Sequence, residues 1–397
     1  MRPQMIVLLV DALGWELAAR VPGFAANLPH RRRLDTILGF SSGALPTLFT
    51  GDMPSVHGRW LMYRRATGGS PFAGFGAIAM MPPRVRRSWK VGRLLHRLVR
   101  ARGVQGYYNL YEVPRALLSR FDLAERRDIF APGGLPRPSL WDTLAHRAVP
   151  WRAWNWRTPE AGNLAALEAA AGGDDDLLFC YTADLDALFH REGSAGGGVR
   201  ARIERYGALL ARLDARARAR GREPWIYLLS DHGMVDVDTT VDVMGRLAPL
   251  AVRWPDDYLA FFDSTMARFW WRTPGAREQV RAALPDGADG RWLDDAALER
   301  EGCRFAAHDY GEDVYLLAPG RLMVPSFMGS QPVRAMHGYD PAHRDMAALL
   351  YANRPLPAVV SHLRDVRAFL EAELDALAGA ADATHAGVAP VAGAARS

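Results

Sequence analysis

Carboxylate and imidazole side chains recur at four places along the 397-residue chain, and each place adjoins a short apolar run. These side chains are Asp11, Asp186, His190, Asp231, His232 and His337. Oxygen and imidazole nitrogen are ligands that suit Zn²⁺ and Mn²⁺. The chain has only 2 cysteines, Cys180 and Cys303, which excludes a cysteine-rich zinc site and a disulfide framework. The sequence therefore contains the ligands of a metal site without thiolate.

Each of these fragments also has an ordinary structural explanation when it is taken alone. An aspartate at the end of a strand can cap a helix. Asp186 and His190 are spaced by one helical turn, at which surface side chains also pair. The fragments become informative together if they lie at one edge of one sheet, because a metal site needs ligands that converge.

A segment rich in hydroxyl groups, residues 40–51, contains a candidate nucleophile. A serine hydroxyl beside a bound cation can lose its proton and attack phosphorus. Ser41 and Ser42 both lie at the start of this segment. The same residue types also form Ser/Thr turns and helix caps, so the residue types alone leave both explanations open.

Apolar runs without alternation predict strands that are buried on both faces. They cover residues 4–11, 176–182, 225–231 and 347–352. Segments with helical character cover residues 159–171, 199–220 and 358–378. Strands that alternate with helices favour a mostly parallel sheet with helices on both faces. In such α/β sheets ligands bind at the carboxyl ends of the strands, where we expect the acidic and imidazole side chains to meet.

Two segments interrupt this alternation, at about residues 60–135 and 249–332. The second contains two closely spaced β-like runs, residues 258–262 and 266–271. We expect both segments to be insertions that cap one edge of the sheet. The sequence thus predicts a single catalytic α/β domain over residues 1–379, followed by a disordered tail at residues 380–397.

The composition, with 49% hydrophobic and 23% charged residues, is that of a soluble globular protein. The apolar run near the start ends at Asp11, too early for a membrane-spanning helix or a secretory signal. The net charge of +5 can favour anionic substrates, but no nucleic-acid-binding motif accompanies it. We therefore expect a cytoplasmic protein that acts on a small molecule, without a nucleic-acid polymer or a membrane as partner.

The order of the motifs resembles the type I phosphodiesterase/nucleotide pyrophosphatase branch of the alkaline phosphatase superfamily. The resemblance rests on LVDALG at 9–14, PTLFTG at 46–51, PSVHG at 54–58, the 186–190 segment, SDHG at 230–233 and HGYD at 337–340. It implies an alkaline-phosphatase-like three-layer sandwich, in which a mostly parallel central sheet has helices on both faces and carries cap insertions.

The resemblance also implies a site for two divalent cations, most consistent with Zn²⁺ and with Mn²⁺ as the alternative. The first ion would be held by Asp186, His190 and His337, and the second by Asp11, Asp231, His232 and the oxygen of the nucleophile. Counted back nine residues from Thr50, as the family's spacing implies, the nucleophile is Ser41. Ser42 is the alternative, since one gap would shift the alignment.

From this resemblance we expect a metal-dependent phosphodiesterase that hydrolyses a small soluble diester, such as a nucleotide derivative, through a phosphoseryl intermediate. A phosphomonoesterase or phosphoryl transferase on the same site is the first alternative. A non-catalytic relative that binds a ligand or a partner is the second.

The sequence departs from the family pattern at Met62, where the family's diesterases place an asparagine that binds a phosphoryl oxygen. Arg59, Tyr63 or Arg64 could provide the missing hydrogen-bond donor. Aromatic residues of the insertions could stack on a base or form the core of the insertions. They are Trp60, Trp89, Tyr107, Tyr108, Tyr111, Trp270 and Trp271. The substrate-binding residues are unknown at this point.

Overall fold

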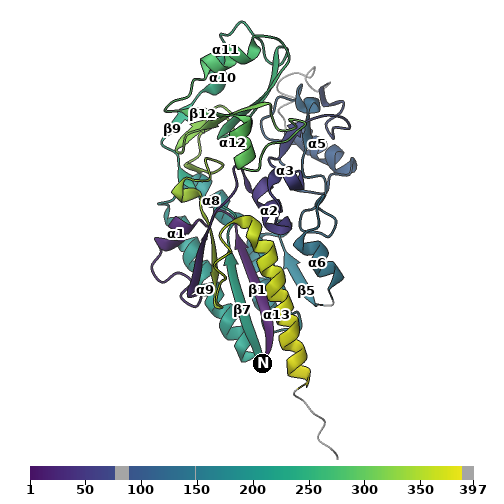
Figure 1. The fold of residues 1–397 in the computed structure, drawn as a ribbon, viewed down its shortest axis with the longest axis vertical. Helices are drawn as coiled ribbons and strands as arrows, with labels where there is room; N and C mark the ends of the chain where they lie inside the picture. The colour runs from purple at the N-terminus through teal and green to yellow at the C-terminus, as the bar shows by residue number, and fades with distance from the viewer. Residues whose placement is uncertain (77–88, 148, 387–397) are drawn as a thin grey trace, which may run out of the picture.

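The computed structural model describes residues 1–76, 89–147 and 149–386, and the four predicted strands lie side by side in one sheet (Figure 1). Its 6 strands have the order β2-β16-β7-β1-β6-β5. The four central strands are β16 (Ala348–Ala352), β7 (Arg222–Leu229), β1 (Arg2–Val10) and β6 (Leu177–Thr182). Their side chains are almost entirely buried, which is the physical reason for the uninterrupted apolar runs.

Strand direction explains why the candidate ligands can converge. β1 pairs in parallel with both β6 and β7, whereas β16 pairs antiparallel with β7. Because β16 runs in the opposite direction, its amino end lies at the edge where β1, β6 and β7 have their carboxyl ends. The segment that leads into β16, which contains His337, therefore reaches the same edge as Asp11 and Asp231.

Two strands of the sheet were not predicted, and both lie at its edges. β2 (His30–Leu34) contains three consecutive arginines and pairs antiparallel with β16. β5 (Trp151–Trp154) pairs in parallel with β6. Neither strand is fully buried, so neither carries a continuous apolar run in its sequence.

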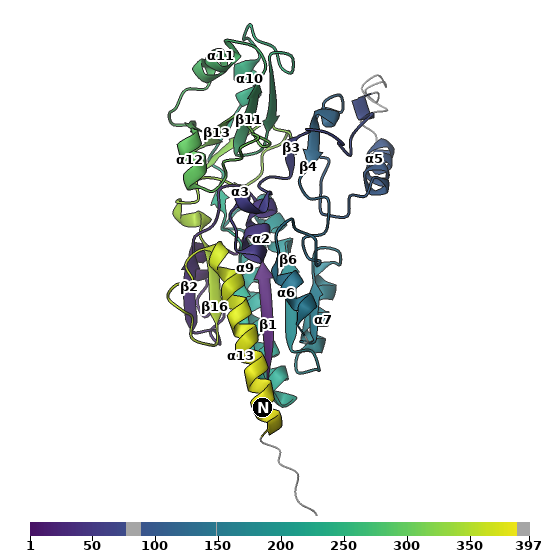
Figure 2. The ribbon, with the colours of Figure 1, turned by 45° about the vertical axis from the view of Figure 1, so that its right-hand side comes forward.

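The alternating side chains of β1 face two different helix layers. One cluster contains Met5, Val7 and Leu9 together with residues of α2 (Ser41–Thr50), α6 (Leu140–His146) and α13 (Val366–Ala386). The other contains Ile6, Leu8 and Val10 together with residues of α1 (Trp15–Ala19), α7 (Glu160–Ala170), α8 (Asp184–Glu192) and α9 (Gly197–Ala219). Figures 1 and 2 show α13 running along β1 on one face of the sheet. The predicted three-layer α/β architecture with a mainly parallel sheet is thus confirmed.

The C-terminal helix differs from its prediction at both ends. A 3-10 turn, η4 (Leu363–Asp365), precedes it, and α13 begins only at Val366. The helix then continues to Ala386 and includes residues 380–386, for which a disordered tail was expected. The rest of that tail, residues 387–397, lies outside the described residues. No helix in the described part of the chain is long and apolar enough to cross a membrane.

The two insertions pack against each other above the sheet (Figures 1 and 2). The first contains β3 (Tyr63–Arg65), α5 (Trp89–Ala101), η2 (Leu118–Arg120) and β4 (Phe121–Leu123). The second contains a 4-stranded antiparallel sheet of β10 (Tyr258–Phe262), β11 (Met266–Trp271), β13 (Asp313–Leu317) and β12 (Gly290–Leu293). The ring of Phe261 lies 5.0 Å from the rings of Tyr63 and Phe121, measured between centroids. The insertions therefore share one apolar core.

Shorter elements connect these parts. They are α3 (Pro54–His57), β8 (Val235–Asp236), β9 (Thr239–Val241), α10 (Val243–Leu247), α11 (Ala276–Ala283), α12 (Asp295–Arg300), β14 (Arg321–Met323), β15 (Ala335–Met336) and η3 (Arg344–Met346). β8 pairs with β15, which places the segment after β7 beside the segment that precedes His337.

Arg268 connects the two insertions through a fully buried guanidinium group. Its Nε donates to Asp263 Oδ2 at 2.8 Å, and its Nη1 donates to the carbonyl oxygen of Tyr63 at 2.8 Å. The Arg268→Met variant leaves Asp263 buried without its cation. We expect the free energy of unfolding, measured by urea titration, to fall by about 3 kcal/mol or more. An equally large loss in the Arg200→Met control, which breaks an exposed pair expected to contribute less than about 1 kcal/mol, would contradict this.

Candidate active site at the sheet edge

The candidate ligands converge at the carboxyl edge of the central strands in two groups of three. One group consists of Asp186, His190 and His337, and the other of Asp11, Asp231 and His232. Within each group one ligand atom of every residue lies within 4.8 Å of the others. Four separate parts of the chain supply these residues, so the convergence is a property of the tertiary structure.

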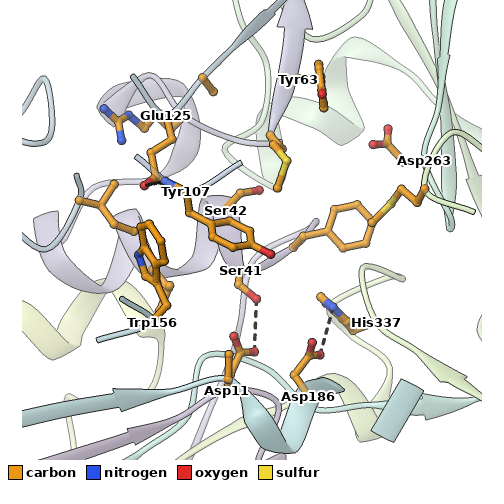
Figure 3. Close-up of a pocket in the computed structure, with 18 of the residues that line it drawn as sticks. Asp11, Ser41, Ser42, Tyr63, Tyr107, Glu125, Trp156, Asp186, Asp263 and His337 are labelled. Atoms are coloured by element: carbon orange, nitrogen blue, oxygen red, sulfur yellow. Dashed lines mark hydrogen bonds and ion pairs between the residues drawn. The ribbon is translucent and has the colours of Figure 1, made fainter. Parts of the chain in front are cut away.

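The first group is built on one turn of α8. Asp186 Oδ2 lies 3.3 Å from His190 Nε2 across that turn, and Asp186 Oδ1 lies 3.5 Å from His337 Nε2. Figure 3 shows Asp186 and His337 on the same side of the site, next to Asp11. Because the helix holds Asp186 and His190 on one face, His337 is the ligand that folding must bring to them.

The second group follows the ends of β1 and β7. His232 Nε2 lies 3.2 Å from Asp11 Oδ1 and 3.4 Å from Asp231 Oδ2. The ring of His232 stacks on that of His337, with 3.9 Å between centroids and an interplanar angle of 10°. This stacking places the two groups next to each other.

Backbone carbonyl groups orient two of the histidines. His190 Nδ1 lies 2.8 Å from the carbonyl oxygen of Ala335, and His232 Nδ1 lies 2.8 Å from that of Gly233. A carbonyl oxygen can only accept, so each Nδ1 carries a hydrogen, and in the neutral form of each ring Nε2 presents its lone pair to the site. Gly233 is required there, because a Cβ atom at this position would lie 2.0 Å from the carbonyl oxygen of Asp345.

Buried oxygen atoms without partners show that this donor set fits cations. Asp231 Oδ2 and Asp186 Oδ1 are buried and have no hydrogen-bond partner among the described residues. Burial, together with the charge of Asp11, raises the pKa of Asp231. Burial alone would lower the pKa of His232, but the charges of Asp231 and Asp11 raise it. The edge thus concentrates negative charge that divalent cations would offset.

The two candidate serines have different surroundings at the start of α2. Ser41 Oγ lies 3.3 Å from Asp11 Oδ1 and 3.0 Å from His232 Nε2. Ser42 Oγ instead donates to the carbonyl oxygen of Trp60 at 3.2 Å, away from the second group. Ser41 is also the first residue of a 10-residue helix, whose free amide groups favour negative charge nearby. The geometry therefore favours Ser41 over Ser42.

Sequence reasoning missed Tyr181 as a residue of the site. Its hydroxyl group donates a hydrogen bond to Asp11 Oδ2, so it holds that carboxylate in place. Tyr181 pairs with Leu9 at the carboxyl end of β6. The only signal in the sequence was its place near the end of a predicted strand.

Met62 and the three residues considered as replacement hydrogen-bond donors differ in whether their side chains have a free donor. Met62 lines the cavity above the site, where an amide was expected from the family pattern. The Tyr63 hydroxyl donates to the carbonyl oxygen of Asn109, and Arg64 pairs with Asp122. Arg59 donates to a carbonyl group through Nη2, but its buried Nη1 has no hydrogen-bond partner among the described residues. Of the three candidates, Arg59 alone keeps a free donor and lines the cavity.

A cavity of about 220 Å³ lies between this edge and the two insertions (Figure 3). Of the seven aromatic candidates, Tyr107 and Tyr111 line it. Trp60, Tyr108 and Trp270 are buried in the core instead, Trp271 stacks on Phe269 and Trp89 is exposed. Trp156, Glu125 and Asp263 also line the cavity and were not candidates from the sequence.

Comparisons with known proteins agree with this arrangement. No curated protein sequence matches the chain. Residues 5–340 match the family of type I phosphodiesterases/nucleotide pyrophosphatases. In solved structures, murine and human ectonucleotide pyrophosphatase/phosphodiesterase 5 each share the fold, with a TM-score of 0.64, 14% sequence identity and coverage of 94% of this chain and 95% of theirs.

An inactive variant of the murine protein, solved in complex with AMP, has a TM-score of 0.63 and 15% identity, again over 94% of this chain and 95% of its own. The family match covers the motifs from Asp11 to His337, and therefore both groups of ligands. On this basis the chain belongs to the type I phosphodiesterase/nucleotide pyrophosphatase family of phosphoric ester hydrolases, within the alkaline phosphatase superfamily.

Proposed function

We propose that the protein hydrolyses a small phosphoric diester with Ser41 as nucleophile and two divalent cations, most suitably Zn²⁺. The observation that carries this proposal is the position of Ser41 Oγ, 3.0 Å from His232 Nε2 and beside Asp11. The nucleophile thus borders the second group of candidate ligands and lines the same cavity as the first group. Imidazole and carboxylate ligands suit Zn²⁺, and Mn²⁺ is the alternative.

Each of the two groups of candidate ligands would bind one cation. Asp186, His190 and His337 would hold one cation, and the second group would hold the other together with Ser41. When bound, the two cations supply charge that stabilises the attacking and leaving oxygens of an in-line displacement. Tyr181 keeps Asp11 oriented by its hydrogen bond.

Ser41 is the residue that forms the covalent intermediate. Its Oγ forms a bond to phosphorus as the bond from phosphorus to the leaving alcohol breaks, with net transfer of the serine proton to that alcohol. A water molecule then attacks the phosphoserine, which returns the hydroxyl group to Ser41 and releases a phosphomonoester. Such phosphoryl transfer needs mainly positioning and charge stabilisation, and both are provided by a preorganised site.

Metal content and substrate preference test this proposal together. We expect two divalent ions per chain in the purified protein, and a higher kcat/KM with bis-p-nitrophenyl phosphate than with p-nitrophenyl phosphate. Because the murine relative has been seen with AMP, nucleotide diesters are the first natural compounds to assay. Preference for the monoester would instead indicate a phosphatase or transferase. Absence of both bound metal and metal-restored activity would indicate a non-catalytic relative.

A further inference from the structure

Helix α5 has large apolar side chains on its outer side as well as on its inner side. Leu95 and Val99 are buried in the core that the two insertions share. Leu94 and Leu98, one helical turn apart, are instead 54% and 38% exposed, and Trp89 at the start of the helix is 64% exposed. Only four other large apolar side chains of the described residues are exposed, and none of them lies in this helix. Exposed apolar side chains that gather in this way are typical of a binding surface.

The charged side chains of α5 are all positive. The helix contains Lys90, Arg93, Arg97 and Arg100 but no aspartate or glutamate. In the part of the chain that the structure describes, no carboxylate forms an ion pair with any of these four residues. By contrast, exposed arginines of α9 pair with acidic residues one turn away. The outer leucines of α5 are therefore accompanied by four uncompensated positive charges.

Helix α5 lies at the rim of the molecule but is firmly joined to the first insertion. Figures 1 and 2 both show it on the outside of that insertion, away from the central sheet. Arg100 Nη1 donates to the carbonyl oxygen of Val104, and the Tyr108 hydroxyl donates to that of His96, both at 3.0 Å. Tyr107, which lies between these contacts in the chain, lines the cavity. A surface that binds α5 would therefore also hold one wall of the cavity.

The combination of cations and aliphatic side chains indicates which partner fits. A helix with Lys and Arg on one side and Trp and Leu beside them binds at the interface of a bilayer that contains anionic lipids. Nucleic acid would use the cations but leave Leu94 and Leu98 in water. A second α5 would bring four positive charges against four others. A protein groove that binds a helix needs a row of anchors over two turns, and the outer side of α5 has a single pair of leucines.

We propose that α5 docks the protein on the surface of a bilayer that contains anionic lipids. Leu94 and Leu98 would reach the level of the acyl chains, and the four cations would lie among the head groups. Trp89 would lie at the boundary, the depth at which tryptophan is enriched. The expectation of no membrane partner rested on the absence of a spanning helix and of a secretory signal, neither of which a surface contact needs. The docking is independent of the proposed function, because it involves no residue of the candidate active site.

Vesicle sedimentation with the wild-type protein provides the first measurement and depends on no variant. We expect vesicles of equal parts phosphatidylcholine and phosphatidylglycerol to bind the protein at least roughly tenfold more tightly than vesicles of phosphatidylcholine alone. Raising NaCl from about 0.1 M to about 0.5 M should weaken this binding, because salt screens the charges. Absence of binding to the mixed vesicles at the lower salt concentration, or equal binding to both kinds of vesicle, would overturn the docking surface.

A double variant tests the apolar part of the contact. Leu94→Gln/Leu98→Gln should weaken binding to the mixed vesicles by roughly tenfold or more, since two leucines no longer leave water. Both positions are exposed, so circular dichroism should show an unchanged fold. The control Val56→Gln/Val359→Gln makes the same type of change at two exposed positions outside α5 and should bind like the wild-type protein. Wild-type binding by the leucine variant would contradict the proposed contact.

A second double variant tests the charges. Arg93→Gln/Arg97→Gln should weaken the binding by roughly tenfold or more. Arg205→Gln/Arg253→Gln, which removes the same charge at exposed positions outside α5, should have little effect. Equal losses in these two variants would indicate attraction by net charge alone and would overturn a specific role of α5.

The competing partners have their own signatures. Duplex DNA that binds more tightly than the mixed vesicles, with an affinity that the leucine variant keeps, would replace the bilayer by nucleic acid. A dimer in sedimentation velocity that Leu94→Gln/Leu98→Gln converts to a monomer would replace it by a second copy of the chain. None of these binding measurements requires turnover, so they decide the docking surface whether or not the protein hydrolyses a diester.

Discussion

Replacing Ser41 with alanine is expected to reduce the turnover of bis-p-nitrophenyl phosphate by at least about a thousandfold. The change removes only the oxygen that lies 3.0 Å from His232 Nε2 and 3.3 Å from Asp11 Oδ1. Three of the four proposed ligands of the second cation remain, and so do all those of the first. Circular dichroism should therefore show an unchanged fold, and elemental analysis should show most of the metal retained.

The Ser42→Ala variant is the matched control for this experiment. Ser42 differs from Ser41 by a single position in α2, but its hydroxyl group donates to the carbonyl oxygen of Trp60. We expect it to lose a small part of the activity. If the Ser41→Ala variant is fully active and the Ser42→Ala variant is inactive, the nucleophile is Ser42 and not Ser41. Trapping of the phosphoserine by rapid acid quench and mass spectrometry identifies the residue directly.

Loss of the proposed metal ions is expected to reduce activity by a comparable factor. Asp231→Asn weakens one ligand group and His337→Ala the other, so each variant should lose metal and at least about a hundredfold in kcat. Asp231 Oδ2 is buried without a hydrogen-bond partner among the described residues, and the neutral amide in its place would bind a cation less well than the carboxylate. Elemental analysis and diesterase kinetics, before and after chelation, measure both effects.

The exposed His146, whose Nδ1 lies beside the carbonyl oxygen of Asp142, provides a control outside both groups. His146→Ala should retain both the metal and the activity. Chelator-treated protein should regain activity when Zn²⁺ or Mn²⁺ is added back. Unchanged kcat in Asp231→Asn and in the chelated wild-type protein would contradict the two-cation mechanism.

The central strands could be predicted because each must bury both faces. This requirement leaves a continuous apolar run in β1, β6, β7 and β16. The edge strands β2 and β5 have exposed faces and carry arginine or tryptophan, so no such run marks them. The end of α13 was also misjudged, because its alanine-rich sequence after residue 379 has little periodicity yet remains helical to Ala386.

The candidate metal ligands could be named from the sequence for a chemical reason. Few side-chain types can bind a divalent cation, and in an α/β sheet the ligand-binding side chains lie at the ends of the strands. Asp11, Asp231 and the other candidate ligands can therefore be recognised as polar side chains next to apolar runs. Their grouping came from the order of the motifs in a known family, and the structure brings the same residues together.

By itself, the sequence therefore determined the fold class, the family and the set of candidate ligands, because these depend on residue types and on their order along the chain. The tertiary structure alone decided that β16 runs antiparallel to β7, that Ser41 rather than Ser42 faces His232, and that Glu125 and Trp156 line the same cavity. The orientation of a hydroxyl group and the lining of a cavity arise from packing between segments that are distant in the sequence. They therefore cannot be predicted from a local sequence pattern.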